Sequence, residues 1–175
     1  MIPESIKSLI TSLLRKDLEV IVAGGLAVNA HGFARLTTDA DLIVRKKDRE
    51  KATNAMIDLA FTNKGSTDVS TRFGHKSYSV PFVDLLWTEE KTFDIFLSST
   101  VSVADHFKIL SLPHLIAMKI HALSQCHDRF AKDSEDIKFL LKHNSAQIEF
   151  RDYQALVNRF APSDKNQQLL DLYPR

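Results

Sequence analysis

Apolar residues change their spacing along the chain near residue 110. Before that point, short apolar runs alternate with polar stretches, which is typical of strands joined by turns and short helices. After it, apolar residues recur every three or four positions, which is typical of amphipathic helices. We therefore expect an α+β fold, with a core over residues 1–110 and a helical C-terminal subdomain over residues 111–175 packed on it.

The same pattern predicts the individual elements. Helices are expected over 6–14, 26–30, 52–59, 112–124, 133–142 and 151–160. Strands or extended segments are expected over 18–23, 41–44, 77–80, 82–87 and 101–110. The stretch 62–68 is polar and contains Gly65, so it is predicted to be a loop.

The composition is ordinary for a globular protein, with 44% apolar and 26% charged residues. The net charge of +1 gives no sign of a nucleic-acid partner, although a local basic patch is compatible with it. The single cysteine, Cys126, cannot form an internal disulfide and favours a reducing compartment. There is no signal-peptide pattern, and no apolar run approaches the roughly 20 residues of a membrane span. We expect a cytoplasmic protein with no membrane partner.

Asp39 and Asp41 stand one residue apart at the head of the apolar run 42–44. Alternate residues of a strand point to the same face, so the two carboxylates are expected to lie together. Their mutual repulsion calls for a positive partner, and oxygen ligands at this spacing suit Mg²⁺ or Mn²⁺. The alternative is a solvated strand start with no ligand.

Asp84 interrupts the apolar segment 82–87. A buried carboxylate is costly unless it is paired. A strand beside Asp41 would bring Asp84 to the same metal and explain it. The alternative is an ion pair between Asp84 and a buried Arg or Lys.

Gly24 and Gly25 end one apolar run and lead into a predicted helix. Without Cβ atoms at this turn, a phosphate could approach the backbone N–H groups, although a plain strand-to-helix turn explains the pair as well. Arg35, Thr37 and Thr38 precede the Asp pair, where a guanidinium and hydroxyls could meet phosphates or simply form a loop.

Lys119 occupies a position on an apolar helical stripe where an apolar residue would be expected. A lysine on a packed face needs an anion. Asp133 and Asp136 share one face of the next predicted helix, so a helical hairpin could pair them with Lys119. The alternative is that Lys119 faces nucleotide phosphates and the aspartates hold it in place. The seven histidines show no metal-binding spacing.

The segment from Gly24 to Val44, with its Gly-Gly start and an R-x-T-x-D-x-D block, resembles the signature of the DNA polymerase β-like nucleotidyltransferase superfamily. It is closest to the AbiEii-like branch, which contains toxins of toxin–antitoxin systems. Asp84 resembles the third carboxylate of that superfamily, and the residues around Lys119 and Asp133 are similar to its C-terminal helical motifs. The resemblance covers about residues 20 to 141.

The resemblance implies a small mixed β-sheet flanked by helices, and transfer of a nucleotidyl group from an NTP by a two-metal mechanism. It assigns the metal ions and the catalysis to Asp39, Asp41 and Asp84. It assigns nucleotide binding to Gly24, Gly25, Arg35, Thr38, Lys119 and Asp133. The acceptor stays open among tRNA or other RNA, a protein and a small molecule, and a toxin–antitoxin role would add a cognate partner protein. The alternative is a catalytically silent NTP-binding or interaction module of such a pair.

Overall fold

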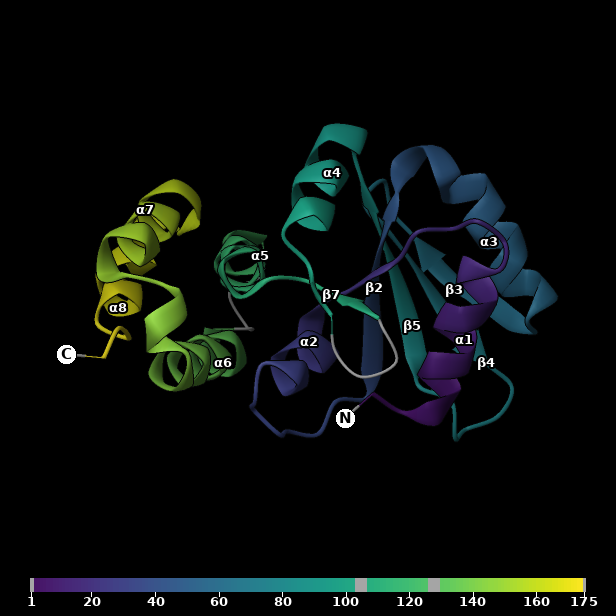
Figure 1. Ribbon diagram of the computed structural model, residues 1–175, viewed down its shortest axis with the longest axis horizontal. Coiled ribbons are helices and arrows are strands. Elements are labelled where there is room, and N and C mark those ends of the chain that lie inside the picture. Colours follow the sequence, from purple (N-terminus) through teal and green to yellow (C-terminus); the bar gives the residue numbers. More distant parts are fainter. Residues whose placement is uncertain (1, 103–106, 126–129, 175) are drawn as a thin grey trace. The chain divides into compact units, whose positions relative to one another are not determined.

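The computed structural model describes residues 2–102, 107–125 and 130–174. Two compact units make up the chain. The first, which we call the sheet unit, comprises Met1–Ala30 and Arg35–Leu110. The second, which we call the helical unit, comprises His31–Ala34 and Ser111–Arg175. Figure 1 labels the α-helices and strands of each unit except β1 (Ile21–Val22) and β6 (Val101–Ser102).

Seven strands form one mixed sheet within the described part of the sheet unit, in the order β3-β4-β5-β2-β1-β7-β6. Their bounds are β1 Ile21–Val22, β2 Asp39–Arg45, β3 Phe61–Ser66, β4 Ser70–His75, β5 Phe82–Thr88, β6 Val101–Ser102 and β7 Lys108–Ile109. The pairs β2–β5 and β1–β7 are parallel, and the other neighbours are antiparallel. The expected mixed sheet flanked by helices is therefore confirmed.

The two central strands, β2 and β5, have one fully buried face and one partly open face. Ala40, Leu42 and Val44 of β2 are buried, as are Val83, Leu85 and Trp87 of β5. The intervening positions carry polar groups at the N-terminal ends of both strands. Since strand side chains alternate between faces, the buried set fixes the direction of the polar set.

The α-helices among the described residues of the sheet unit are α1 Glu4–Leu14, α2 Gly24–Ala30, α3 Arg49–Asp58 and α4 Glu90–Ser98. Helix α1 buries Ile6, Leu9, Ile10 and Leu13 at helical spacing, as the apolar pattern predicts. Helix α4 has one buried residue, Phe93, and is anchored by an ion-pair cluster.

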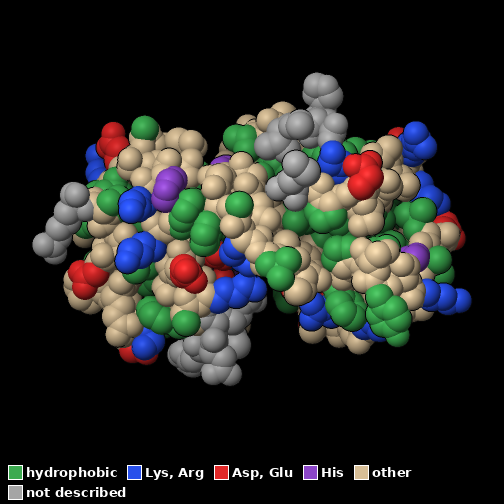
Figure 2. Space-filling view, turned by 90° about the horizontal axis from the view of Figure 1, so that it is seen from below, with side chains coloured by type: hydrophobic (Ala, Val, Ile, Leu, Met, Phe, Trp, Pro, Cys, Tyr) green, Lys and Arg blue, Asp and Glu red, His purple; other side chains and the backbone are tan. Residues whose placement is uncertain are grey.

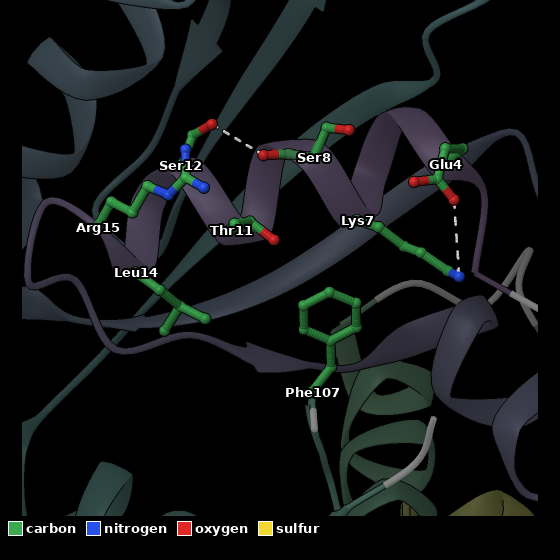
Figure 3. Close-up of a pocket in the computed structure, with 8 residues that line it drawn as sticks. All are labelled: Glu4, Lys7, Ser8, Thr11, Ser12, Leu14, Arg15 and Phe107. Carbon is green, nitrogen blue, oxygen red and sulfur yellow. Dashed lines mark hydrogen bonds and ion pairs between the residues drawn. The ribbon is translucent and has the colours of Figure 1, made fainter. Parts of the chain in front are cut away.

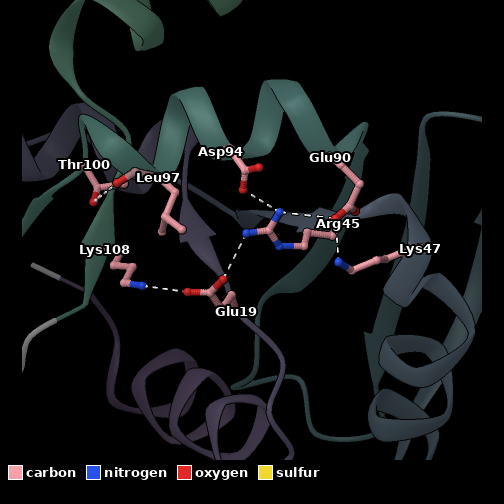
Figure 4. Close-up of polar contacts among 8 residues, drawn as sticks. All are labelled: Glu19, Arg45, Lys47, Glu90, Asp94, Leu97, Thr100 and Lys108. Atoms are coloured by element: carbon pink, nitrogen blue, oxygen red, sulfur yellow. Dashed lines mark hydrogen bonds and ion pairs between the residues drawn. The ribbon is translucent and has the colours of Figure 1, made fainter.

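That cluster is centred on Arg45, at the C-terminal end of β2 (Figure 4). The Arg45 guanidinium lies 4.2 Å from the centroid of the Phe93 ring and forms ion pairs with Glu19, Glu90 and Asp94. A hydrogen bond from Lys108 to Glu19 lowers the pKa of the Glu19 carboxyl, and Arg45 lowers it further. These contacts fix α4 on β2, at the other end of the strand from Asp39.

The helical unit contains α5 Leu112–Gln125, α6 Phe130–His143, α7 Phe150–Phe160 and α8 Asn166–Leu170. Its apolar stripes form a core that includes Leu115, Ile116, Ile137 and Leu140. The Tyr153 hydroxyl is buried and donates a 2.6 Å hydrogen bond to the Leu169 carbonyl, which ties α7 to α8.

Several predicted elements were wrong or incomplete. The stretch 62–68, predicted as a loop, is largely strand β3, whose pairing with β4 shifts between Asn63 and Gly65. An exposed edge strand with a bulge at a glycine does not require alternating apolar residues, so the sequence pattern did not predict strand β3. The stretch 77–80, predicted as extended, forms bends and a turn, because the Ser77 hydroxyl bonds to Ser79 locally and competes with a ladder.

Other elements differ in length or were not predicted at all. Strand β4 and helices α4 and α8 were missed, and the segment predicted over 18–23 is a strand only at Ile21–Val22. The segment predicted over 101–110 contains β6 and β7, while its residues 103–106 lie outside the described residues, as does Cys126.

The surface carries charged side chains of both signs with apolar ones between them on the face seen in Figure 2. This mixture agrees with the small net charge of +1. No helix within the described ranges is long and apolar enough to cross a membrane.

Candidate functional site

Three carboxylates lie on the partly open face of the central strands. Asp39 and Asp41 come from β2, and Asp84 comes from β5. Asp41 pairs in register with Asp84 across the parallel β2–β5 ladder, so both side chains leave the sheet on the same face. We call Asp39, Asp41 and Asp84 the carboxylate row. The sequence predicted this grouping, and the structure brings the three residues together.

Arg72 of β4 supplies positive charge to this row. It lies opposite Asp84 on the antiparallel β4–β5 ladder. Its Nη2 atom is 3.4 Å from Oδ2 of Asp39 and 3.4 Å from Oδ2 of Asp84. The two carboxylate oxygens can therefore be no farther apart than twice that distance. The side chains of Asp39 and Asp84 are 29% and 20% exposed, and that of Arg72 is 47% exposed. The Arg72 side chain is therefore the most exposed of these three.

Gly24 makes room for Asp41. A Cβ atom on Gly24 would stand 1.7 Å from Oδ2 of Asp41, and the φ of Gly24 is +55°, which a side chain rarely adopts. Glycine is thus required here by a close approach and by backbone conformation together. The turn between β1 and α2 fixes the position of the Asp41 carboxylate, and in this structure that carboxylate fills the space beside the glycine.

Thr37 fills the space beside Gly25, as Asp41 does beside Gly24. A Cβ atom on Gly25 would stand 2.5 Å from the Thr37 Oγ1 atom and 3.2 Å from Nη2 of Arg35. The Thr37 hydroxyl donates to Asp39, with the carboxylate and carbonyl oxygens both 3.1 Å away. Arg35 is held through its backbone, whose N–H donates to Asn29 while its carbonyl accepts from the Asn29 amide. Gly24 therefore lies against a carboxylate of the row, whereas Gly25 is connected to Asp39 through Thr37 and Arg35 lies beside Gly25.

A groove of about 600 Å³ adjoins the row at its Asp39 end. Thr38 lines it, together with Thr37 and with residues from the ends of β3 and β4 and the turn between β4 and β5. Phe82, another lining residue, pairs in register with Asp39, and the Arg72 guanidinium lies 5.2 Å from the centroid of its ring. None of the three carboxylates is among the described residues that line the groove, and Thr37 and Phe82 connect it to the row.

Lys119 lies within the helical unit and is held there by two aspartates. Its Nζ atom is 2.8 Å from Oδ1 of Asp133 and 2.6 Å from Oδ2 of Asp136. The Lys119 side chain is 7% exposed and those of both aspartates are 1% exposed. The hairpin arrangement that the sequence offered as one alternative is therefore present, and it joins α5 to α6.

A second hollow of about 720 Å³ lies along one side of α1 (Figure 3). Figure 3 shows Lys7 and Glu4 directed toward each other, and their ion pair measures 3.6 Å. Leu14 and Phe107 are the apolar residues among the described lining of this hollow. It contains no member of the carboxylate row, so it offers no comparable chemistry.

A divalent ion at these carboxylates would have to displace the Arg72 guanidinium, which now lies between Asp39 and Asp84. As the side chains stand, no group of three His, Cys, Asp or Glu residues in the described part of the chain is arranged to hold a metal ion. The donor atoms are nevertheless carboxylate oxygens, which Mg²⁺ and Mn²⁺ prefer, and the guanidinium stands where positive charge is needed. To hold an ion together, the carboxylates themselves would have to rearrange, in addition to any movement of the Arg72 side chain.

Sequence reasoning missed Arg72, and it did not predict the bond between Thr37 and the Asp39 carboxylate. Arg72 lies in a strand that the apolar pattern did not predict, although buried Thr71 and Phe73 on either side of it give an alternating signal. The Thr37 hydroxyl was expected to meet phosphates or the backbone, or to belong to a simple loop, and its bond to the Asp39 carboxylate, two residues on, was not predicted.

Comparisons with known proteins identify the fold. No protein-family model matches the chain, and no curated protein matches it by sequence. Among solved structures, the lincosamide antibiotic adenylyltransferase LnuA, bound to lincomycin, superposes with a TM-score of 0.62 at 13% identity, over 80% of this chain and 96% of LnuA. The antibiotic-resistance enzyme ANT(2")-Ia, in complex with adenylyl-2"-tobramycin, gives 0.55 at 11% identity, over 95% of this chain and 92% of its own.

A third solved structure is the polyadenylate synthase of Megavirus. It superposes with a TM-score of 0.58 at 14% identity, over 89% of this chain and 35% of the viral enzyme. These likenesses show that the chain has the nucleotidyltransferase fold.

Proposed function

We propose that this protein is a metal-dependent nucleotidyltransferase, which moves an NMP group from an NTP to an acceptor hydroxyl. The observation that carries the proposal is the in-register pairing of Asp41 with Asp84, with Asp39 on the same face, in a nucleotidyltransferase fold. Three carboxylates on neighbouring strands would repel one another without a cation. In the nucleotidyltransferase superfamily that the sequence resembles, carboxylates in this arrangement hold metal ions for phosphate chemistry.

In this proposal Asp39, Asp41 and Asp84 would hold Mg²⁺ or Mn²⁺ in place of the Arg72 guanidinium. When bound, the ions would withdraw electron density from the phosphates and stabilise the charge on the attacking and leaving oxygens. The half-exposed Arg72 side chain can leave the carboxylates at small cost, because an ion pair open to water contributes little.

The proposed transfer is a displacement at the α-phosphorus of the NTP. The acceptor oxygen forms a bond to phosphorus while the bond to the oxygen that bridges the α- and β-phosphates breaks, and pyrophosphate leaves. Asp84 is proposed to receive the proton of the acceptor hydroxyl, since its carboxylate is 20% exposed and can reach an acceptor.

Nucleotide binding is assigned to Gly24, Gly25, Arg35 and Thr38 on the sheet unit and to Lys119 and Asp133 on the helical unit. For the first group, support comes from the contact of both glycines with residues at the carboxylate row. For Lys119, a role with phosphates would require its Nζ atom to exchange an aspartate for the ligand, since both near oxygens now belong to Asp133 and Asp136.

Two narrower assignments rest on the sequence motif alone. They are membership of the AbiEii-like branch and a role in a toxin–antitoxin pair with a cognate partner protein. A catalytically silent NTP-binding module is the second candidate, and the intact row of three carboxylates argues against it, because such a module has no need to keep all of them.

The test is incubation with each labelled NTP in turn, with Mg²⁺ or Mn²⁺ and with bulk cellular RNA or protein. Transfer of label that disappears in the Asp39→Ala and Asp84→Ala variants supports the proposal. NTP binding without any transfer would favour the silent module, and the absence of both would refute both candidates.

A further inference from the structure

The groove beside the carboxylate row has a one-sided charge. Lys64 from β3 and Lys76 after β4 both line it, and both side chains are exposed. No Asp or Glu is among the described residues that line it. A ligand that lies in this groove therefore meets cations along its walls and no carboxylate until it reaches the row itself.

Aromatic side chains accompany these cations. Tyr78, in the turn between β4 and β5, projects fully into solvent, and Phe82 is 47% exposed at the start of β5. Large exposed aromatic residues are costly to leave in water, and they are typical of surfaces that stack flat ligand rings. Tyr78 is thus open to a stacking base, and Phe82 offers its exposed part beside the Arg72 guanidinium.

Gly74 leaves room for two side chains that line the groove. A Cβ atom on Gly74 would stand 2.9 Å from the Cε atom of Lys64 and 3.0 Å from a ring carbon of Phe82. The lysine stem and the aromatic ring therefore meet over a residue that has no side chain. A larger residue at this position would push the two apart and change the shape of the groove.

Two residues of the groove connect it to the carboxylates of the proposed function. Phe82 pairs with Asp39, and Thr37 both lines the groove and donates to the Asp39 carboxylate. A chain that lies along the groove would bring its end to the row. Positive walls also disfavour acceptors that carry several amines, because like charges would face each other at short range.

We infer that this groove binds the acceptor, and that the acceptor is the end of a single-stranded nucleic acid. Lys64 and Lys76 contact its phosphates, while Tyr78 and Phe82 stack its bases. Its terminal ribose hydroxyl forms the bond to the α-phosphorus, pyrophosphate leaves, and the proton passes to Asp84. The inference rests on the proposed function for this transfer step, whereas binding of the strand does not depend on it.

The binding test uses the full chain without NTP or metal, and a fluorescent single-stranded RNA of about 12 nucleotides as the probe. Anisotropy should report binding that weakens as salt rises. In Lys64→Ala/Lys76→Ala the slope of log affinity against log salt should become shallower by about 1.4, since each phosphate contact on a single strand contributes about 0.7. Tyr78→Ala should weaken binding by about tenfold, as expected for the loss of one base stack.

Two matched controls distinguish an effect at the groove from the loss of any two lysines and from the replacement of any glycine. Lys46→Ala/Lys47→Ala removes two lysines that already pair with Glu89 and Glu90, and it should leave RNA binding unchanged. Gly74→Ala should weaken binding, whereas Gly65→Ala, where a Cβ atom meets nothing within 4 Å, should not. Equal loss in both lysine pairs, or no loss in the groove variants, would overturn the inference.

The transfer assay then separates this inference from the proposed function. If Lys64→Ala/Lys76→Ala loses transfer to RNA while it still binds NTP, the acceptor assignment is supported. If wild type and this variant label RNA equally well, or if only a small molecule or a protein is labelled, the groove assignment is refuted and nucleotidyl transfer stands. If RNA binds in the groove but no NTP group is transferred to it, the proposed function fails and the binding site stands.

Discussion

Arg72 lies opposite Asp84 on the neighbouring antiparallel strand, and its Nη2 atom is equally close, at 3.4 Å, to the carboxylates of Asp84 and Asp39. One guanidinium therefore offsets the repulsion between carboxylates from two different strands. A divalent ion at the same carboxylates would compete with it. Metal binding and the Arg72 ion pairs are in this account alternative states of one site.

Removal of this guanidinium should strengthen metal binding. In Arg72→Ala the carboxylates lose the competing cation, so we expect Mn²⁺ to bind about tenfold more tightly, a gain of about 1.4 kcal/mol. Without metal, the same variant should unfold at a lower temperature, because the carboxylates then repel one another. Isothermal titration calorimetry and thermal unfolding measure the two effects.

Arg15→Ala is the matched control, since Arg15 is exposed on the sheet unit and lies outside the carboxylate row. It should change neither quantity. Weaker Mn²⁺ binding in Arg72→Ala than in wild type would contradict the competition.

Gly24→Ala should destabilise the sheet unit and displace the Asp41 carboxylate. The substitution adds a methyl group 1.7 Å from Oδ2 of Asp41, at a residue whose φ is +55°. The strain alone is expected to cost about 1–3 kcal/mol. Gly32→Ala isolates that strain, since Gly32 has a φ of +102° and a Cβ atom added to it would meet nothing within 4 Å.

We expect chemical denaturation to give a larger loss for Gly24→Ala than for Gly32→Ala. Only Gly24→Ala should also weaken Mn²⁺ binding. Equal losses, with metal binding intact in both variants, would show that the approach of Asp41 to Gly24 has no consequence for the site.

The sequence revealed the parts of the site that violate a local pattern. Asp84 interrupts an apolar strand and Lys119 interrupts an apolar helical stripe, so each was identified from the cost of burying a charge. The two aspartates that hold Lys119 were also found, because helical spacing puts them on one face.

Arg72 and the groove could not be found in the same way. Arg72 lies on a strand of mixed polarity beside the edge strand β3, where exposure on one face permits almost any residue. Lys64, Gly74 and Lys76 come together only through the β3–β4 pairing and the turn after it, which depend on a bulge and on local serine hydrogen bonds. A bulge and local hydrogen bonds of this kind produce no periodic pattern of apolar residues in the sequence.

Lys119→Met should destabilise the helical unit. It removes the ammonium group that Asp133 and Asp136 share, and it leaves two buried carboxylates facing each other. Breaking a buried pair of this kind typically costs about 3–5 kcal/mol. Lys138→Met, at an exposed position of α6, should cost far less. If denaturation finds Lys119→Met as stable as wild type, the structural role of this lysine is wrong.

His114 should make stability depend on pH below about 6.5. Burial lowers the pKa of the His114 imidazole from its ordinary value of 6.5, so the folded protein resists a proton that the unfolded chain accepts. This contribution to stability is full above that value and is lost as the pH falls below it.

The free energy of unfolding of wild type should therefore drop more between about pH 7 and pH 5 than that of His114→Asn. His121→Asn, which alters an exposed histidine of the same helix, should behave as wild type. An identical pH dependence in His114→Asn and wild type would contradict the effect of burial.

Catalysis of nucleotidyl transfer by the carboxylate row can be tested with parallel reactions in which the NTP is labelled at the α- or at the γ-phosphate. We expect the α label to become attached to the acceptor and the γ label to leave as pyrophosphate, only with Mg²⁺ or Mn²⁺ present. Asp84→Asn should reduce this transfer by more than about a hundredfold, beyond the loss typical of residues that only support metal ligands. Asp68→Asn, an exposed position before β4, should retain it. Attachment of the γ label, or undiminished transfer in Asp84→Asn, would contradict the account.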